Sequence, residues 1–131
     1  MVSTTKAIKT QCSWLMGCNL KEHQITTGVG VLTQWQLTGF DLEAQQIDSH
    51  TATLALSREQ EFDYRNNLFS LTPKLYLIIE ASSDLSTPLI TQLTASKSVA
   101  NEYMNSEYLV LTNEMPGPVQ AWLADFVCSK H

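Results

Sequence analysis

The chain has 131 residues, a length that suits one domain, and 44% of them are hydrophobic, which argues against a disordered protein. Eight basic residues stand against thirteen acidic ones, and the net charge of -5 argues against a protein that binds nucleic acid or an anionic membrane surface. Charged residues make up only 16% of the chain, so we expect a surface rich in neutral polar groups.

The N-terminal part of the chain gives one clear strand signal. Residues 1–10 are polar and are expected to form a flexible N-terminus that precedes a single domain over 11–131. The cluster from Trp14 to Met16 fits a short strand or a packed N-terminal segment. Between Gly28 and Thr38, apolar and polar side chains alternate, which predicts a β-strand with one drier face. Residues 39–49 have no sustained periodicity and are expected to connect two elements.

The middle of the chain predicts a strand that leads into a short helix. Residues 51–56 are typical of a strand, and Ser57 follows as a candidate helix N-cap, with Gln60 at the spacing of a capping box. We therefore expect a helix near 58–67. Glu61 and Arg65 have the i,i+4 spacing of a helical ion pair.

The remaining elements alternate between strands and helices. Residues 75–79 predict a central strand buried on both faces, and further strands are expected over 89–94 and 108–111. Ser96 is a candidate N-cap for a helix near 97–105. An amphipathic C-terminal helix is expected near 118–129, because its apolar residues recur at helical spacing. We expect an α+β domain with a mostly antiparallel sheet, either open or barrel-like.

The cysteines indicate a cytoplasmic protein. Cys12, Cys18 and Cys128 form neither a metal-binding pair nor an even disulfide set, and no secretory signal accompanies them, so a reducing compartment fits best. Cys12, Cys18 and His23 have a spacing unlike that of the usual zinc ligands. The sequence therefore predicts no metal and no cofactor.

The richest polar group, Glu61, Tyr64, Arg65 and Asn67, lies in the predicted helix near 58–67. Acidic and phenolic groups could support acid/base chemistry if they met in a pocket. A solvated helix face with local ion pairs is the simpler interpretation, because charge patterns of this kind usually serve surface support. Whether the chain is an enzyme stays open, with a non-catalytic role preferred.

The order of several residue blocks resembles a bacterial family of proteins of unknown function that are encoded beside molybdenum- or tungsten-dependent formate dehydrogenases. The resemblance covers residues 52–131, and its blocks are Leu54 to Leu56, Glu59, Glu61, Tyr64, Asn67–Leu68, Ser70, Pro73, Leu75 to Ile79, Thr94 to Ser96, Ala100, Tyr103, Met115–Pro116, Val119, Trp122 and Phe126–Val127. The chain departs from that family at Ser57 and Val99. The resemblance implies a cytoplasmic accessory role in the maturation, assembly or regulation of a formate dehydrogenase, and it supplies no catalytic residue.

Three hypotheses follow for function. The first is a non-catalytic protein-interaction domain with a protein partner, for which Trp35, Tyr64 and Met115–Pro116 are the candidate exposed contacts. The second is a small-molecule-binding domain or an unrecognised enzyme that uses the Glu61, Tyr64, Arg65 and Asn67 cluster. The third is a structural homodimer that pairs Trp122 and Phe126 of the C-terminal helix across a symmetric contact.

Overall fold

A long β-hairpin dominates the N-terminal third of the computed structural model, which describes residues 8–80 and 88–128. Strand β1 (Ser13–Thr27) and strand β2 (Gly30–Asp41) pair antiparallel along their length, and a register shift beside Asn19 and Leu20 marks a bulge. Glycine suits the tight turn between them, because Gly30 has a φ of 142°, a conformation that L side chains rarely adopt.

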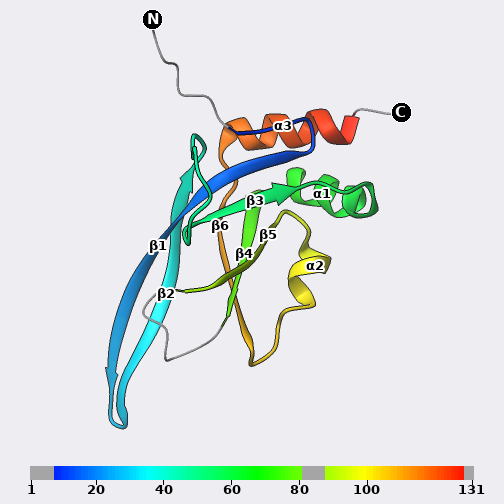
Figure 1. Ribbon diagram of the computed structural model, residues 1–131. Helices are drawn as coiled ribbons and strands as arrows, with labels where there is room; N and C mark the ends of the chain where they lie inside the picture. The colour runs from blue at the N-terminus through cyan, green and yellow to red at the C-terminus, as the bar shows by residue number, and fades with distance from the viewer. Residues whose placement is uncertain (1–7, 81–87, 129–131) are drawn as a thin grey trace, which may run out of the picture.

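The other strands and the helices follow the hairpin and build the body of the domain (Figure 1). Their bounds are β3 (Thr51–Ala55), a 3-10 turn η1 (Arg58–Gln60), α1 (Glu61–Leu68), β4 (Lys74–Glu80), β5 (Ile90–Thr94), α2 (Lys97–Asn101), β6 (Tyr108–Glu114) and α3 (Gly117–Cys128). The sheet has the order β2-β1-β3-β5-β4-β6. Strands β3 and β5 run parallel, and the other neighbours run antiparallel. The sheet is therefore mostly antiparallel, as the sequence predicted, and the one parallel pair makes it mixed.

The sheet curls into a half-barrel, which brings its two outer strands towards each other. The side-chain nitrogen Nδ2 of Asn113 on β6 donates a hydrogen bond of 2.6 Å to the carbonyl oxygen of Leu37 on β2. No ladder of backbone hydrogen bonds joins β2 to β6 in the described part of the chain. The barrel-like alternative is thus realised only in part.

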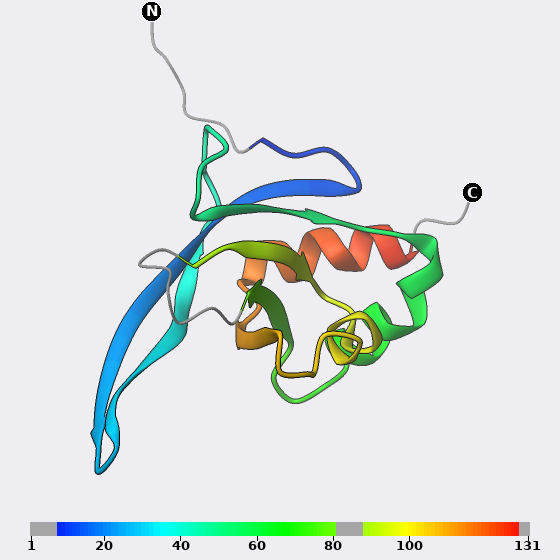
Figure 2. The same ribbon diagram turned by 60° about the horizontal axis from the view of Figure 1, so that its bottom comes forward.

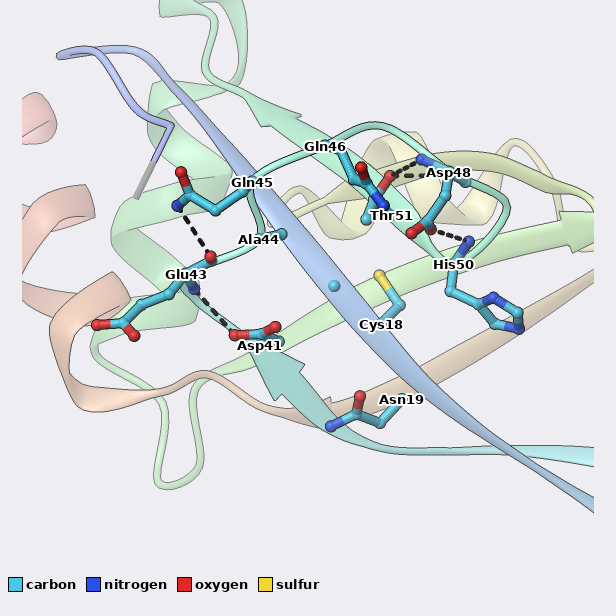
Figure 3. Close-up of a pocket in the computed structure, with 11 residues that line it drawn as sticks. Cys18, Asn19, Asp41, Glu43, Ala44, Gln45, Gln46, Asp48, His50 and Thr51 are labelled. Carbon is cyan, nitrogen blue, oxygen red and sulfur yellow. Dashed lines mark hydrogen bonds between the residues drawn. The ribbon is translucent and has the colours of Figure 1, made fainter. Parts of the chain in front are cut away.

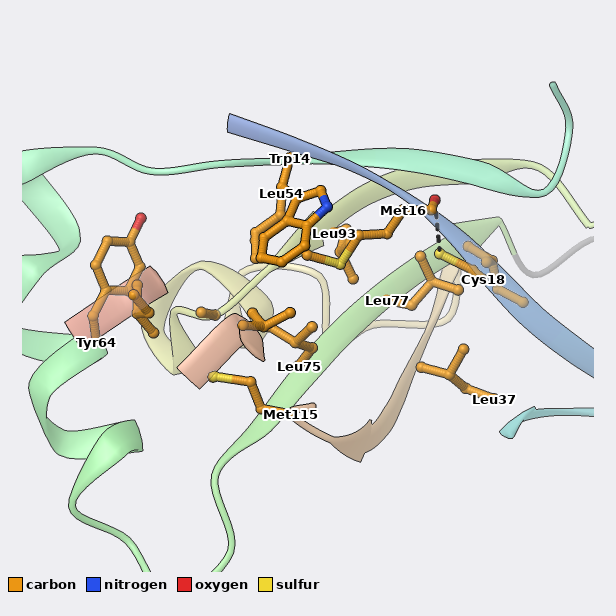
Figure 4. Packing of buried hydrophobic residues seen from close by; sticks show 14 of the residues in the cluster. Trp14, Met16, Cys18, Leu37, Leu54, Tyr64, Leu75, Leu77, Leu93 and Met115 are labelled. Atoms are coloured by element: carbon orange, nitrogen blue, oxygen red, sulfur yellow. Dashed lines mark hydrogen bonds between the residues drawn. The ribbon is translucent and has the colours of Figure 1, made fainter. Parts of the chain in front are cut away.

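The hydrophobic core lies between the curled sheet and helix α3 (Figure 4). The strands contribute their inward side chains, including Met16, Leu54 and Leu77, and α3 buries Val119, Leu123 and Val127 against them. The rings of Trp14 and Trp122 meet edge to face with centroids 5.3 Å apart. Burying one large apolar side chain stabilises a fold by about 1.5–3 kcal/mol, so this cluster is the main source of stability.

The structure confirms most predicted elements and changes some bounds. The helix near 58–67 is η1 followed by α1, and the C-terminal helix near 118–129 is α3. The helix near 97–105 is shorter than predicted, because α2 ends at Asn101 and only turns follow. Strand β4 buries Leu75, Leu77, Ile78 and Ile79, as expected of a strand covered on both faces.

The predicted flexible N-terminus lies mainly outside the described residues, which begin at Ile8. The part that is described contacts the body. The carbonyl oxygen of Ile8 accepts a hydrogen bond from Leu15 N, and that of Thr10 accepts one from Trp122 Nε1 at 2.9 Å. The Nζ atom of Lys9 lies 4.0 Å from the centroid of the Trp14 ring. Residues 8–10 are therefore held against β1 and α3.

Candidate functional site

The charged members of the predicted polar cluster join α1 to the end of α3. Glu61 forms ion pairs with Arg58 at 2.9 Å and with Arg65 at 3.2 Å, which confirms the predicted i,i+4 pair. Hydrogen bonds from Arg58 and then Arg65 lower the pKa of the Glu61 carboxyl. Both arginines also donate to the last turn of α3, to the carbonyl oxygens of Phe126 at 2.8 Å and Val127 at 3.4 Å. These carbonyls lack partners within the helix, so the two arginines cap α3.

The uncharged members of the cluster are also engaged in structural contacts. Tyr64 is buried, with 2% of its surface exposed, and its hydroxyl oxygen accepts a hydrogen bond from Ser57 N at 3.0 Å. Burial raises the pKa of the Tyr64 phenol. Asn67 donates through Nδ2 to the carbonyl oxygens of Lys74 and Ala95, at 2.7 and 3.0 Å, and its Oδ1 accepts from Lys74 N at 2.9 Å. Asn67 thereby joins α1 to the beginning of β4 and to the segment after β5.

Asp63 extends this network to α2, a role that the sequence analysis missed. One of its carboxylate oxygens accepts a 2.6 Å hydrogen bond from the Ser96 hydroxyl and a 3.1 Å bond from Ser98 N. The hydrogen bond from Ser96 is the main cause of the lowered pKa of the Asp63 carboxyl. Ser96 itself caps α2, because its oxygen accepts from Val99 N. The helical spacing of Asp63 identifies its face of α1, but its partners lie more than thirty residues away in the chain.

The contacts of the cluster do not form the pocket that acid/base chemistry requires. Glu61 and Arg65 pair on the outside of α1, whereas Tyr64 points inward and Asn67 binds backbone groups (Figure 4 shows Tyr64 among the buried residues). The structure therefore brings the four predicted residues onto one short helix without making their polar atoms converge. Together these residues join α1 to the end of α3 and to the sheet.

Two of the residues predicted to be exposed contacts are buried. Tyr64 is one, and Met115 is the other, with 2% of its surface exposed. Met115 lies at the corner between β6 and α3, where its N donates to the carbonyl oxygen of Pro73 and its own carbonyl accepts from Gln120 Nε2. Pro116 is half-buried beside it. The prediction of exposure was wrong for Tyr64 and Met115, because both side chains complete the core.

A cavity of about 380 Å³ lies between β1 and the loop that follows β2 (Figure 3). Its lining includes the acidic residues Asp41, Glu43 and Asp48 and the buried thiol of Cys18. Burial raises the pKa of that thiol to about 12, so it is not a nucleophile near neutral pH. Asp41 and Asp48 accept backbone hydrogen bonds from within the loop, from Glu43 N and His50 N. No group of three or more residues able to hold a metal ion occurs in the described residues.

The outer part of the β1–β2 hairpin, which we call the hairpin arm (residues 21–36), is largely exposed to solvent. The arm extends away from the helices in both views (Figures 1 and 2). Three of its apolar side chains face solvent: Val29 is 97% exposed, Val31 59% and Ile25 40%, and Ile25 lies on the opposite face of the ribbon from Val31. Exposed apolar side chains on a projecting element are typical of a binding surface.

The arm meets the body at a groove of about 550 Å³ between β2 and β6. The groove is lined by Trp35, Gln36, Leu37, Thr38, Val110, Leu111, Thr112 and Asn113, and none of these residues is charged. Trp35 is half-exposed and packs partly against the core. Unlike Tyr64 and Met115, the predicted contact residue Trp35 thus lies beside an open, uncharged surface.

The sequence held a signal for the arm that the prediction of a single strand did not use. The Gly28–Val29–Gly30 segment is a hairpin turn signal, because two glycines stand close together between segments of extended chain. Strand β1 was missed beyond Cys18, because residues 21–26 are exposed on both faces and show no alternation of apolar and polar side chains.

The fold and its exposed arm define this protein as a mixed half-barrel α+β domain with a projecting two-stranded hairpin. The chain matches, over residues 18–131, the family described as proteins of unknown function, DUF3305, and it belongs to that family. No curated protein and no solved structure matches the chain. Among the helices that the structure describes, none is long and apolar enough to cross a membrane.

Proposed function

We propose that this protein is a non-catalytic accessory domain that binds a protein partner through its hairpin arm and the adjoining groove. The partner we propose is a formate dehydrogenase or one of its maturation proteins, in the cytoplasm, and the role is in maturation, assembly or regulation. This choice of partner rests on the residue blocks between Ala52 and His131 that resemble the formate dehydrogenase-associated family.

The observation that carries the binding role is the exposure of apolar side chains on the arm. A two-stranded ribbon gains little stability by itself in water. Val29 and Val31 add nothing to the core, because most of their surface faces solvent. A partner that covers them would remove apolar surface from water, which stabilises a complex by roughly 25 cal/mol per Å² before the cost of association.

The competing enzyme hypothesis has less support from the arrangement of its residues. It requires Glu61, Tyr64, Arg65 and Asn67 to line one cavity, but their hydrogen bonds go to neighbouring helices and to backbone groups. A site whose polar atoms are already satisfied has few left for a substrate. We therefore prefer recognition to catalysis.

Affinity purification of the tagged chain from its native cells during growth on formate tests the proposal. We expect a formate dehydrogenase component to co-purify with the unchanged chain and to be lost with Val29→Asp, which puts a charge at the exposed tip of the arm. Leu71→Asp is the matched control, because Leu71 is equally exposed but lies on the α1–β4 connection. Co-purification that Val29→Asp leaves unchanged would remove the arm from the proposal, and the absence of any specific partner would overturn it.

A further inference from the structure

The outer edge of the hairpin arm has a defined set of backbone groups that face away from β1. In an antiparallel pair, successive residues of one strand direct their N–H and C=O groups alternately towards the partner strand and away from it. The carbonyl oxygen of Leu37 faces away from β1, because it accepts the hydrogen bond from Asn113 on β6. The register from Leu37 to Gly30 contains no shift, so Val31, Thr33 and Trp35 present their backbone groups to the same side.

The turn of the hairpin supports the same assignment. Thr27 and Gly30 are paired across a loop of two residues. The residues that close such a loop direct their backbone groups towards each other. Gly30 therefore faces β1, and the residue after it, Val31, faces outward.

This edge carries no charge, in contrast to the other edge of the arm. The eleven residues from Gly30 to Phe40 include no Asp, Glu, Lys or Arg. The β1 side of the arm carries Lys21 and Glu22, and both are exposed. Proteins usually protect an edge strand from pairing with charged side chains, with proline or with bulges. Between Gly30 and Leu37, β2 has none of these.

We propose that two copies of this chain pair antiparallel through the outer edges of their β2 strands, with the two-fold axis at Thr33. In this register Thr33 lies opposite Thr33 of the second copy, and Val31 lies opposite Trp35 of the second copy on both sides of the axis. Outward-facing residues meet outward-facing residues, so the ladder has about six backbone hydrogen bonds. Thr–Thr pairs and pairs of an aromatic with a β-branched residue are favourable cross-strand neighbours.

A second copy suits this edge because charge does not oppose the contact. Each chain has a net charge of -5, so two copies repel each other at long range, and an uncharged contact surface adds no close pair of like charges to that repulsion. The β2 edge supplies such a surface and is complementary to itself, as a two-fold contact requires. A charged strand from another protein would find no ion-pair partner on this edge, because residues 30–40 contain no charged side chain.

We prefer this contact to the homodimer expected from the C-terminal helix. Trp122 packs on Trp14 with ring centroids 5.3 Å apart, and Phe126 packs on Tyr64 at 6.1 Å and on the guanidinium of Arg58 at 4.1 Å. These two aromatic side chains are thus engaged within their own chain. The pairing goes beyond the proposed function, since it adds a second copy of this chain, joined through the backbone edge of β2, to the partner proposed for the arm and the groove.

Sedimentation over a wide concentration range tests the pairing. We expect the unchanged chain to approach twice its 14.7 kDa mass as concentration rises. Thr33→Lys and Thr33→Glu should each raise the dissociation constant at least about tenfold, because like charges meet at the axis. An equal mixture of the two variants should regain the dimer mass. Thr26→Lys, on the β1 side of the arm, is the matched control and should dimerise like the unchanged chain.

A chain that stays monomeric at every concentration would overturn the pairing, and so would a dimer that both Thr33 variants leave intact. Cross-linking tests the register independently. In a Cys12→Ser, Cys128→Ser background, Thr33→Cys should form a disulfide-linked dimer under mild oxidation, since facing residues of such a pair lie about 5.5 Å apart at Cα, within disulfide range. Thr26→Cys should not. A monomeric Thr33→Lys variant that still co-purifies with the formate dehydrogenase component would leave the proposed function intact.

Discussion

Replacement of Asn67 distinguishes a structural role of the polar cluster from a functional one. Its side chain takes part in three hydrogen bonds, of 2.7, 3.0 and 2.9 Å, with backbone groups of Lys74 and Ala95. One such bond contributes about 0.5–1.5 kcal/mol net, and a backbone group left unpaired in a buried place costs about 1–3 kcal/mol. We therefore expect Asn67→Ala to lower the free energy of unfolding by about 3 kcal/mol.

Equilibrium unfolding in urea measures this loss as a lower transition midpoint with an unchanged slope. Asn66→Ala is the matched control, because Asn66 is the exposed neighbour on the same helix and should change the stability by less than about 0.5 kcal/mol. Asn67→Asp keeps the acceptor for Lys74 N but sets a carboxylate oxygen against the carbonyl oxygens of Lys74 and Ala95, so it should be no more stable than Asn67→Ala.

The reasoning would be refuted by an Asn67→Ala protein as stable as the unchanged chain. In that case water would replace the hydrogen bonds of Asn67, and the hypothesis that this residue binds a small molecule would gain support. A large loss of stability with Asn66→Ala would also contradict it, because the effect would then belong to the helix as a whole.

Three further predictions concern other parts of the fold. The pKa of the Asp63 carboxyl is lower in the folded chain than in the unfolded chain. Its stabilising effect is therefore complete above the unfolded pKa, near 3.9, and is lost as the pH falls through the folded value. Asp63→Asn should flatten the acid side of a stability–pH curve measured by thermal unfolding. Gly17→Ala should lower the free energy of unfolding by about 1–3 kcal/mol, because the new Cβ would lie 3.0 Å from Cβ of Asp41. Gly28→Ala is the control, since its Cβ would meet nothing within 4 Å, and its loss of stability in a urea titration should be smaller. Thiol labelling at pH 8 should modify the two exposed cysteines quickly and Cys18 only after unfolding, and rapid labelling of Cys18 in the folded protein would contradict its burial.

Local sequence signals predicted the elements whose side chains repeat regularly. The apolar spacing of α3 and the apolar run of β4 both survive in the structure. Both serine caps are also confirmed, since Ser57 accepts from Glu59 N and Ser96 accepts from Val99 N. These signals are local, because each depends on residues within one or two turns of the chain.

The parallel pairing of β3 with β5 had no local signal. Leu54 and Leu93 are register partners that lie far apart in the sequence, and the choice between parallel and antiparallel neighbours depends on how the intervening elements pack. The partners of Asn67 and Asp63 were hidden for the same reason. Only the folded chain brings Ala95 and Ser96 to these side chains.

The candidate site shows a different limitation, because the polar groups that attracted functional interest in the sequence take part in structural contacts in the folded chain. Charged and phenolic residues attract attention as chemistry, but in α1 they fasten helices. The residues that we assign to recognition, such as Val29 and Val31, have an ordinary composition and become notable only through their exposure. Exposure depends on what the rest of the chain covers, and a strand pattern alone does not give it.

The division between body and arm explains why both proposed contacts lie on the hairpin. The network around α1 ties the helices to the sheet with hydrogen bonds that are already satisfied, so the polar groups of this network are engaged within the chain. The arm keeps its strand geometry because its base is anchored: Leu37 is buried in the core, and β1 continues into its pairing with β3. A prearranged edge binds with a smaller loss of conformational entropy than a flexible loop, so the cost of ordering the arm is met when the domain folds. An exposed, uncharged and anchored edge is therefore better explained as a binding element than as an unfinished part of the barrel.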